Sequence, residues 1–279
     1  MRKSGMTLLD AVKRIDVEHY RHQKAGPAAV VRLYLVADDI GVNMKLEDVD
    51  ETVIDKAVAL WRASGNKNAT INRKLSLLSK TLRTAHRRWR ILERMPIIDK
   101  FKEAQVPIHL LTPAEESAVL NYMNGVHPDM SDIIMFLIDT GCRLSEMRKT
   151  GKASVDWINN IVNIYDGKTG FRAVPMTERV KGILHRLVIE EGQELPWASF
   201  SRERCRYLWD KSRPTMNKVG DKAFHLHCLR HTCATRLLKA GVSVPVVSRW
   251  LGHSTLDMTM RYLRLVPSDL QEACRLMQA

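Results

Sequence analysis

One short stretch of β-forming sequence interrupts a chain that otherwise has helical spacing, and this contrast limits the fold more than any other feature. The stretch runs from Val155 to Pro175, and its apolar residues are mostly β-branched: Ile158, Ile161, Val162, Ile164 and Val174. Two turn-forming clusters divide it, Asn159-Asn160 and Asp166-Gly167-Lys168-Thr169-Gly170. Short β-rich runs separated by such clusters indicate a small antiparallel sheet with two tight turns. We therefore expect a mainly α protein with one small antiparallel β-sheet.

The remaining apolar residues recur at the spacing of amphipathic helices. Before the β-rich stretch, helices are expected at 7–23, 28–40, 51–63, 67–94 and 133–138, and another begins at Thr112, where Pro113 and Glu115 complete a capping box. After it, helices are expected at 178–190, 201–212, 230–240, 244–251, 255–265 and 268–278. Pro96 and Pro107 bracket a mixed stretch. We predict an all-helical domain at 1–95, a linker at 96–111 and a second domain at 112–279.

The composition indicates a globular protein inside the cell. No apolar run is long enough to span a membrane, and no signal-peptide core follows the basic N-terminus. Five scattered cysteines without a Cys-x-x-Cys pair argue against a disulfide framework and against a zinc ribbon. We therefore expect an intracellular protein that is not associated with a membrane.

Positive charge is concentrated in one predicted helix. The formal net charge is +13, and residues 67–94 hold nine basic residues and one acid, Glu93. On a helical wheel the apolar residues form one stripe, and a different face holds Arg73, Lys80, Arg83, Arg87, Arg90 and Arg94. A solvated outer face is the plainer interpretation, but such faces usually mix both signs of charge. We predict that this row of cations contacts DNA phosphates.

The chemistry-bearing residues lie mainly between 225 and 262. His227 and Arg230 are three residues apart and share one helical face, where they could hold a phosphate. His253 and Tyr262 would point in opposite directions on one unbroken helix. Gly252 and Ser254-Thr255 offer a helix end and a new helix start between them, so two helices could turn both side chains toward one site.

Plainer interpretations exist for several of these residues. A single tyrosine such as Tyr262 is usually a half-buried aromatic residue, and we assign His231 a structural role. Arg143 follows the end of a buried helix, where it can point into a cleft. Lys168 lies in the second turn of the predicted sheet and would usually be solvated.

Taken together, these motifs resemble the tyrosine recombinase (phage integrase) family, in the family's order and spacing. They are Thr140-Gly141-x-Arg143-x-Ser145-Glu146, Lys168-Thr169-Gly170, His227-x-Leu229-Arg230-His231-Thr232, Leu251-Gly252-His253-Ser254 and Tyr262. The resemblance is strong over residues 112–266. Ala69-Thr70-Ile71-Asn72-Arg73 is more loosely similar to the last helix of the family's core-binding domain. The resemblance to the family implies a helical, SAM-like core-binding domain followed by an α+β catalytic domain.

The resemblance also implies a role for each site residue. Tyr262 would attack a DNA phosphodiester, giving a 3′-phosphotyrosyl link and a free 5′-hydroxyl. Arg143 and Arg230 would stabilise the charge of the pentacoordinate state, an effect of roughly 3–4 kcal/mol per well-placed donor, and would favour the phenolate. Lys168 would protonate the leaving oxygen, with His227 and His253 assisting proton transfer. No cofactor and no metal are expected.

The resemblance implies double-stranded DNA as the partner, bound by a homotetramer on paired recombination sites, with accessory DNA-bending proteins as further candidates. It also implies a location in the cytoplasm of a bacterial host, at the nucleoid. Integration and excision of a phage or mobile element is the first expectation, and Xer-type resolution of replicon dimers is the second. A non-catalytic DNA-binding relative and a tyrosine topoisomerase are the remaining alternatives. The helix at 268–278 could dock on a neighbouring protomer or on its own domain.

Overall fold

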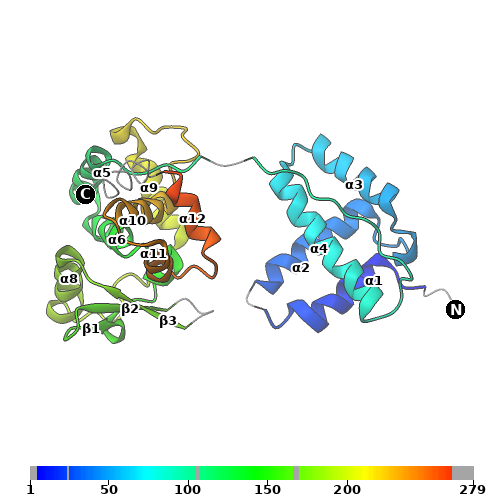
Figure 1. The fold of residues 1–279 in the computed structure, drawn as a ribbon, viewed down its shortest axis with the longest axis horizontal. Helices are drawn as coiled ribbons and strands as arrows, with labels where there is room; N and C mark the ends of the chain where they lie inside the picture. The colour runs from blue at the N-terminus through cyan, green and yellow to red at the C-terminus, as the bar shows by residue number, and fades with distance from the viewer. Residues whose placement is uncertain (1–4, 24, 105–106, 166–169, 266–279) are drawn as a thin grey trace, which may run out of the picture. The chain divides into compact units, whose positions relative to one another are not determined.

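The structure is a computed structural model that describes residues 5–23, 25–104, 107–165 and 170–265. The chain divides into two compact units, Met1–Gln105 and Val106–Ala279 (Figure 1). Within the described ranges, no helix has both the length and the apolar character needed to cross a membrane.

The N-terminal unit contains helices and no named strand over the residues described. Its elements are α1 (Leu8–Ile15), the π-helical turn η1 (Asp16–Tyr20), α2 (Gly26–Ile40), the 3₁₀ turn η2 (Leu46–Asp48), α3 (Glu51–Ala63) and α4 (Asn68–Arg87). Thr7 and Asp10 form a capping box at the start of α1. The apolar faces of the helices meet in one core that includes Leu33, Trp61 and Leu75. Packing of α4 on this core leaves its basic face outward.

The C-terminal unit combines helices with one sheet. Its elements are α5 (Pro113–Val126), α6 (Pro128–Thr140), α7 (Leu144–Met147), η3 (Lys152–Ser154), β1 (Val155–Asp156), β2 (Ile161–Tyr165), β3 (Phe171–Pro175), α8 (Glu178–Leu184), η4 (His185–Glu190), α9 (Arg202–Ser212), η5 (Arg213–Met216), α10 (His227–Lys239), α11 (Val244–Leu251) and α12 (Asp257–Leu263). The strands are antiparallel in the order β1-β2-β3, with Val162 opposite Val174. The expected class, mainly α with a small antiparallel sheet, is confirmed.

Helix α6 runs through the core of this unit and ends where the site begins. Nine of its residues are buried, and it contacts α5, α8 and α10. The chain then leaves the helix at Gly141, which has the left-handed conformation (φ +61°). A Cβ on Gly141 would lie 2.6 Å from Leu251 Cδ2 and 2.9 Å from Cys233 Sγ, so only glycine allows this close approach of α6 to α10 and α11.

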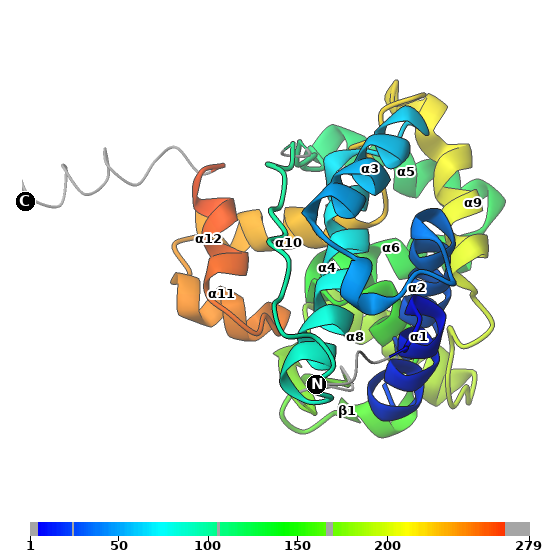
Figure 2. The ribbon, with the colours of Figure 1, turned by 90° about the vertical axis from the view of Figure 1, so that its right-hand side faces the viewer.

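Helices α10, α11 and α12 contact one another pairwise, and they lie together in the ribbon views (Figure 1 and Figure 2). Helix α11 also contacts β3. The ends of α6 and α11, the start of α10 and all of α12 therefore meet in one region, to which the sheet contributes one strand.

Candidate active site and nucleic-acid interface

Arg230 is a buried cation held by two backbone carbonyls. It is 2% exposed, its Nη1 donates to Gly141 O (2.7 Å) and its Nη2 donates to Leu251 O (2.6 Å). Burial and then the neighbouring charge of Arg143 lower the pKa of the guanidinium to about 10, so Arg230 remains charged at neutral pH. Among the described residues, no carboxylate pairs with it. An unpaired buried charge is costly, and a bound anion would offset that cost.

Arg143 is the second guanidinium of the site and is more open to solvent. It precedes α7, and its side chain is 35% exposed. Nη1 lies 2.5 Å from Glu146 Oε1, and the backbone N–H of Arg143 donates to Glu146 Oε2 (2.8 Å). Burial alone would raise the pKa of Glu146, but hydrogen bonds from Arg172 and Arg143 hold it below its ordinary value. The carboxylate is therefore charged and fixes Arg143 at the edge of the site.

Tyr262 lies inside the C-terminal unit, with its hydroxyl on a histidine. It is 2% exposed, and His231 Nδ1 is 2.8 Å from Tyr262 Oη. Burial raises the pKa of the phenol, although the charges of Arg261 and Arg230 act to lower it. Arg230 thus favours the phenolate, as expected of the arginines of the site, but the pKa is raised overall because the cost of burying the phenolate exceeds the stabilisation by the guanidinium groups.

His253 also lies beside Tyr262. Gly252 ends α11 in the left-handed conformation, and α12 begins at Asp257 after an N-cap at Leu256, one residue beyond the cap expected at Ser254-Thr255. The ring of His253 lies nearly parallel to that of Tyr262, with centroids 6.3 Å apart. Its Nδ1 shares a hydrogen bond of 2.7 Å with the buried Thr259 hydroxyl.

His231 and His253 lie beside the tyrosine, His227 lies against His231, and all three are neutral at pH 7. The rings of His227 and His231 meet edge to face, with centroids 4.7 Å apart. Burial and then neighbouring positive groups lower the pKa of His227 and of His253 to about 4, and that of His231 to about 3. A neutral imidazole has one donor and one acceptor nitrogen, so each can accept one hydrogen bond and donate another here.

These depressed pKa values predict acid sensitivity of the C-terminal unit. Between the ordinary histidine pKa of 6.5 and the folded value of about 4 for His227, the unfolded chain binds more protons than the folded chain. Stability is therefore full above pH 6.5 and is lost as the pH falls toward 4. We expect a lower unfolding temperature at about pH 5 than at about pH 7.5, measured by calorimetry.

The variant His227→Gln should show a smaller loss of stability on acidification than the wild type. His22→Gln, at an exposed position of the N-terminal unit, serves as the matched control and should behave like the wild type. Equal unfolding temperatures of the wild type at the two pH values would contradict the prediction.

Two residues of this region were not assigned to the site from the sequence. His231, interpreted as structural, contacts the Tyr262 hydroxyl directly; its position one turn after His227 was the available signal. Arg172 on β3 contacts Glu146 and the end of α11, and its place in the strand carried no comparable signal.

Two expected features lie outside the described residues. Lys168 falls in the interval 166–169 between β2 and β3, and the helix expected at 268–278 falls in 266–279. Within the described ranges, no group of three or more histidine, cysteine, aspartate or glutamate residues is arranged to hold a metal ion.

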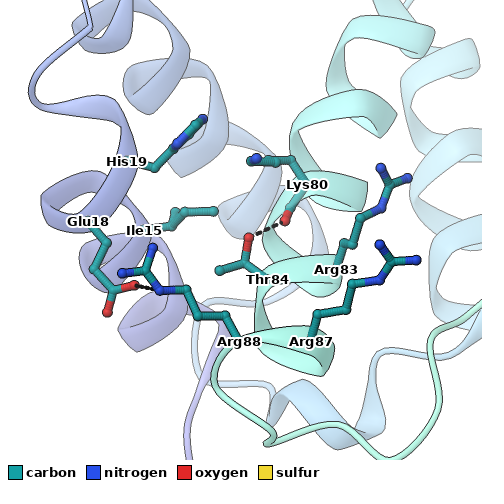
Figure 3. Close-up of a pocket in the computed structure, with 8 residues that line it drawn as sticks. All are labelled: Ile15, Glu18, His19, Lys80, Arg83, Thr84, Arg87 and Arg88. Atoms are coloured by element: carbon teal, nitrogen blue, oxygen red, sulfur yellow. Dashed lines mark hydrogen bonds and ion pairs between the residues drawn. The ribbon is translucent and has the colours of Figure 1, made fainter.

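The basic face of α4 forms one wall of a pocket in the N-terminal unit. The pocket has a volume of about 220 Å³, and Figure 3 shows residues of α4 facing residues of α1 and η1. It is lined by Ile15, Glu18, His19, Lys80, Arg83, Thr84, Arg87 and Arg88. Glu18 is the single acid of the lining. Its carboxylate already pairs with Arg14 (2.8 Å) and accepts a hydrogen bond from the Trp89 indole N–H (2.9 Å). The lining is therefore strongly positive.

Among the described residues, no carboxylate forms an ion pair with Lys80, Arg83 or Arg87. All three are exposed, as are Arg73 on the same helix and Arg90 beyond its end. Such cations are available to a polyanion.

The expectation of a helix continuing to residue 94 is wrong. Helix α4 ends at Arg87, because the N–H groups of Trp89 and Ile91 turn back to Thr84 O and Ala85 O. Arg90 has φ +53° at this helix end. Arg90 therefore leaves the helical face, and Arg94 lies 3.5 Å from Glu51.

Comparison with known proteins agrees with this geometry. The model of the phage integrase family matches residues 109–268. The integrase of Salmonella phage P22 is 25% identical over 254 residues, covering 84% of this chain and 63% of the integrase. Tyrosine recombinase XerA of Saccharolobus solfataricus is 32% identical over 140 residues, covering 50% of this chain and 47% of XerA. The chain thus spans about half to two thirds of the length of these two relatives.

Solved structures share the fold. The Tn1549 transposon integrase in complex with a circular intermediate DNA superposes with a TM-score of 0.78 and 19% identity, over 92% of this chain and 95% of the other. A lambda integrase tetramer bound to a Holliday junction gives a TM-score of 0.70 and 17% identity, over 93% and 78%. The family model covers more than half of the chain and includes every element of the site, and this chain therefore belongs to the phage integrase family.

Proposed function

We propose that this chain is a site-specific DNA recombinase that cuts and rejoins DNA through a covalent tyrosine intermediate. The observation that carries the proposal is the surroundings of Tyr262: its hydroxyl hydrogen-bonds to a neutral imidazole, and the nearby Arg230 is buried without a carboxylate partner among the described residues. A nucleophile, a proton acceptor and an anion site are thus combined.

In the proposed step, Tyr262 Oη forms a bond to the scissile phosphorus while the bond from phosphorus to the 5′-oxygen breaks. The phenolic proton passes to a neighbouring imidazole, for which His231 is placed at 2.8 Å. The products are a 3′-phosphotyrosyl link and a 5′-hydroxyl. Rejoining is the reverse attack, and because the ester conserves the energy of the broken bond, no ATP is consumed.

Arg143 and Arg230 would bind the non-bridging oxygens, where negative charge grows during the attack. His227 and His253 would bind phosphate and pass protons. Lys168, which family resemblance makes the acid, would protonate the departing 5′-oxygen. This assignment remains a proposal.

We assign double-stranded DNA to both units, with residues 1–95 as a core-binding domain and 112–279 as the catalytic domain. The pocket of Figure 3 supports the first part, because its free cations suit a phosphate backbone. A lambda integrase tetramer binds a Holliday junction, and we propose the same assembly for this chain, with accessory DNA-bending proteins.

We propose integration and excision of a phage or mobile element as the biological role. Relatives support this assignment, since the integrase of phage P22 and the Tn1549 transposon integrase are both similar to this chain. The XerA proteins are similar too, so resolution of replicon dimers is the second role. We place the protein in the cytoplasm of a bacterial host, at the nucleoid.

A duplex nicked beside the scissile phosphate tests the activity. After cleavage, the short fragment between the cut and the nick diffuses away, so rejoining is prevented and the covalent product accumulates. We expect an adduct whose ester mass spectrometry locates on Tyr262. An ester on another side chain would overturn the proposal. Efficient relaxation of plasmids of any sequence would indicate a topoisomerase instead.

The basic face of α4 gives a second prediction. The double variant Arg83→Gln/Arg87→Gln should bind duplex DNA more weakly, and the slope of log K against log salt should become shallower by about 0.9 for each phosphate that the variant no longer neutralises. Lys56→Gln, an exposed lysine on α3, is the matched control and should keep the wild-type slope. A double variant with an unchanged slope would remove this face from the DNA interface.

A further inference from the structure

Arg172 is a buried arginine of β3 that no step of the reaction above uses. Its side chain is 9% exposed. Nε donates to Trp250 O (2.9 Å), and Nη2 donates to Glu146 Oε2 (2.7 Å). Nη1 is buried and has no hydrogen-bond partner among the described residues. Because a buried guanidinium is costly, one with an unused donor calls for a functional explanation.

Glu146 connects Arg172 to the phosphate-binding machinery. Its side chain is 5% exposed, and its two oxygens serve both arginines: Oε1 accepts from Arg143 Nη1, and Oε2 accepts from Arg172 Nη2. The carboxylate therefore lies between two guanidinium groups. If Arg172 were absent, Glu146 would lose the donor that holds it from the side of the sheet.

Arg172 is itself fixed at its other side. The Trp250 carbonyl that it binds belongs to the last turn of α11. A Cβ on the next glycine, Gly252, would lie 3.1 Å from Arg172 Cδ and 3.2 Å from Nη1, so the guanidinium packs closely against this helix end. Strand β3 and helix α11 thus hold Arg172 in one orientation. Because Arg172 is fixed, its hydrogen bond to Glu146 also fixes the position of that carboxylate.

The positive charge around Glu146 also connects Arg172 to phosphate binding. Arg143 and Arg172 share the carboxylate of Glu146, and Arg230, held by backbone carbonyls, adds a third guanidinium group to the region. The charge of Arg172 also contributes, after burial and Arg143, to lowering the pKa of Arg230, so the three groups act on one region. The net charge of two positive units matches a phosphodiester that gains a second negative charge in the pentacoordinate state.

We propose that Arg172 is a positioning residue for strand cleavage, which acts through Glu146 to set the orientation of Arg143. The proposal rests on the recombinase function proposed above. Arg172 does not touch the substrate. It keeps the carboxylate charged and in place, so that Arg143 meets the scissile phosphate in one geometry.

Arg172→Met keeps the length of the side chain and removes every donor. On the nicked duplex we expect the first-order rate of adduct formation to fall about 100-fold, as for a catalytic group misplaced by about 1 Å. The affinity for the duplex should stay within about threefold, because the charges of the α4 face remain. Arg172→Lys keeps the charge but cannot bridge Trp250 and Glu146 at once, so its cleavage rate should fall nearly as much. It replaces Arg172→Met in the experiment if the methionine variant does not fold.

Two readouts separate positioning from a general loss of stability. In an Arg143→Ala background, Arg172→Met should cost less than about threefold, since residues that act in one chain are not additive. On a substrate with a neutral methylphosphonate at the scissile position, the defect of Arg172→Met should shrink to less than about tenfold, because the neutral group depends less on guanidinium charge.

Arg179→Met is the matched control. Arg179 is a partly buried arginine of the same unit that pairs with Asp139 and Glu116, and its loss should leave cleavage by the folded protein unchanged. Three results would overturn the proposal. Arg172→Met could cleave at the wild-type rate, or its defect could multiply with that of Arg143→Ala in the double variant. Its defect could also be equally large on the phosphodiester and the methylphosphonate substrate. If the wild type formed no adduct, the proposed function itself would fail.

Discussion

Tyr262→Phe is expected to yield no covalent protein–DNA product on the nicked duplex. The substitution removes one oxygen, and without it no ester to phosphorus can form on this side chain. The ring stays buried, and the hydroxyl has one hydrogen bond among the described residues, to His231. The loss in stability should therefore be small, about 1 kcal/mol. The measurement is a denaturing gel of labelled DNA, beside a thermal melt of the variant.

Tyr207→Phe is the matched control for this experiment. Tyr207 is 60% exposed on α9, so its hydroxyl is not part of the site, and the variant should form the adduct at the wild-type rate. An adduct with Tyr262→Phe would show that another side chain attacks the phosphate.

Arg143→Ala is expected to slow adduct formation by about 100- to 1000-fold, the usual effect of removing one donor that stabilises developing negative charge. Two features favour a folded variant. The side chain is 35% exposed, and Glu146 keeps its 2.7 Å hydrogen bond from Arg172. Duplex affinity should change by less than about threefold, because many other cations still bind the phosphate backbone. Quenched-flow or manual time courses with excess enzyme measure the rate separately from binding.

Arg148→Ala supplies the control, since Arg148 is an exposed cation five residues further along that donates to Ala198 O (3.1 Å). It should cleave like the wild type. If Arg143→Ala lost duplex binding while bound complexes reacted at the normal rate, the assignment of Arg143 to the reaction would be wrong.

Local patterns predicted much of the fold and the elements that carry the site. The capping box at Thr112 and the break at Gly252 are determined by neighbours within a few residues, and both are present in the structure. The β-rich stretch likewise forms the three-stranded sheet. Such signals are visible in a sequence because the interactions that produce them are short in range.

Interactions between distant segments could not be predicted in the same way. Arg172 and Trp250 are 78 residues apart, and nothing in either segment indicates the other. His231 shares a helix with Arg230, but its role depends on a tyrosine 31 residues further along. The end of α4 was missed because a non-glycine residue, Arg90, takes the left-handed conformation, which a helical wheel does not reveal.

The guanidinium groups near Tyr262 favour the phenolate, as expected, but they do not decide its ionisation. Counting charges near Tyr262 predicts a lowered pKa, but the count omits the cost of removing the ionised oxygen from water. In the folded protein that cost is larger than the attraction of Arg261 and Arg230.

With only 2% of Tyr262 accessible, the phenol is enclosed by its own unit. In the proposed reaction, the side chains around it would have to move before a phosphate could reach the oxygen. The enclosure that makes the phenol a poor acid would then couple the proposed cleavage to the binding of DNA.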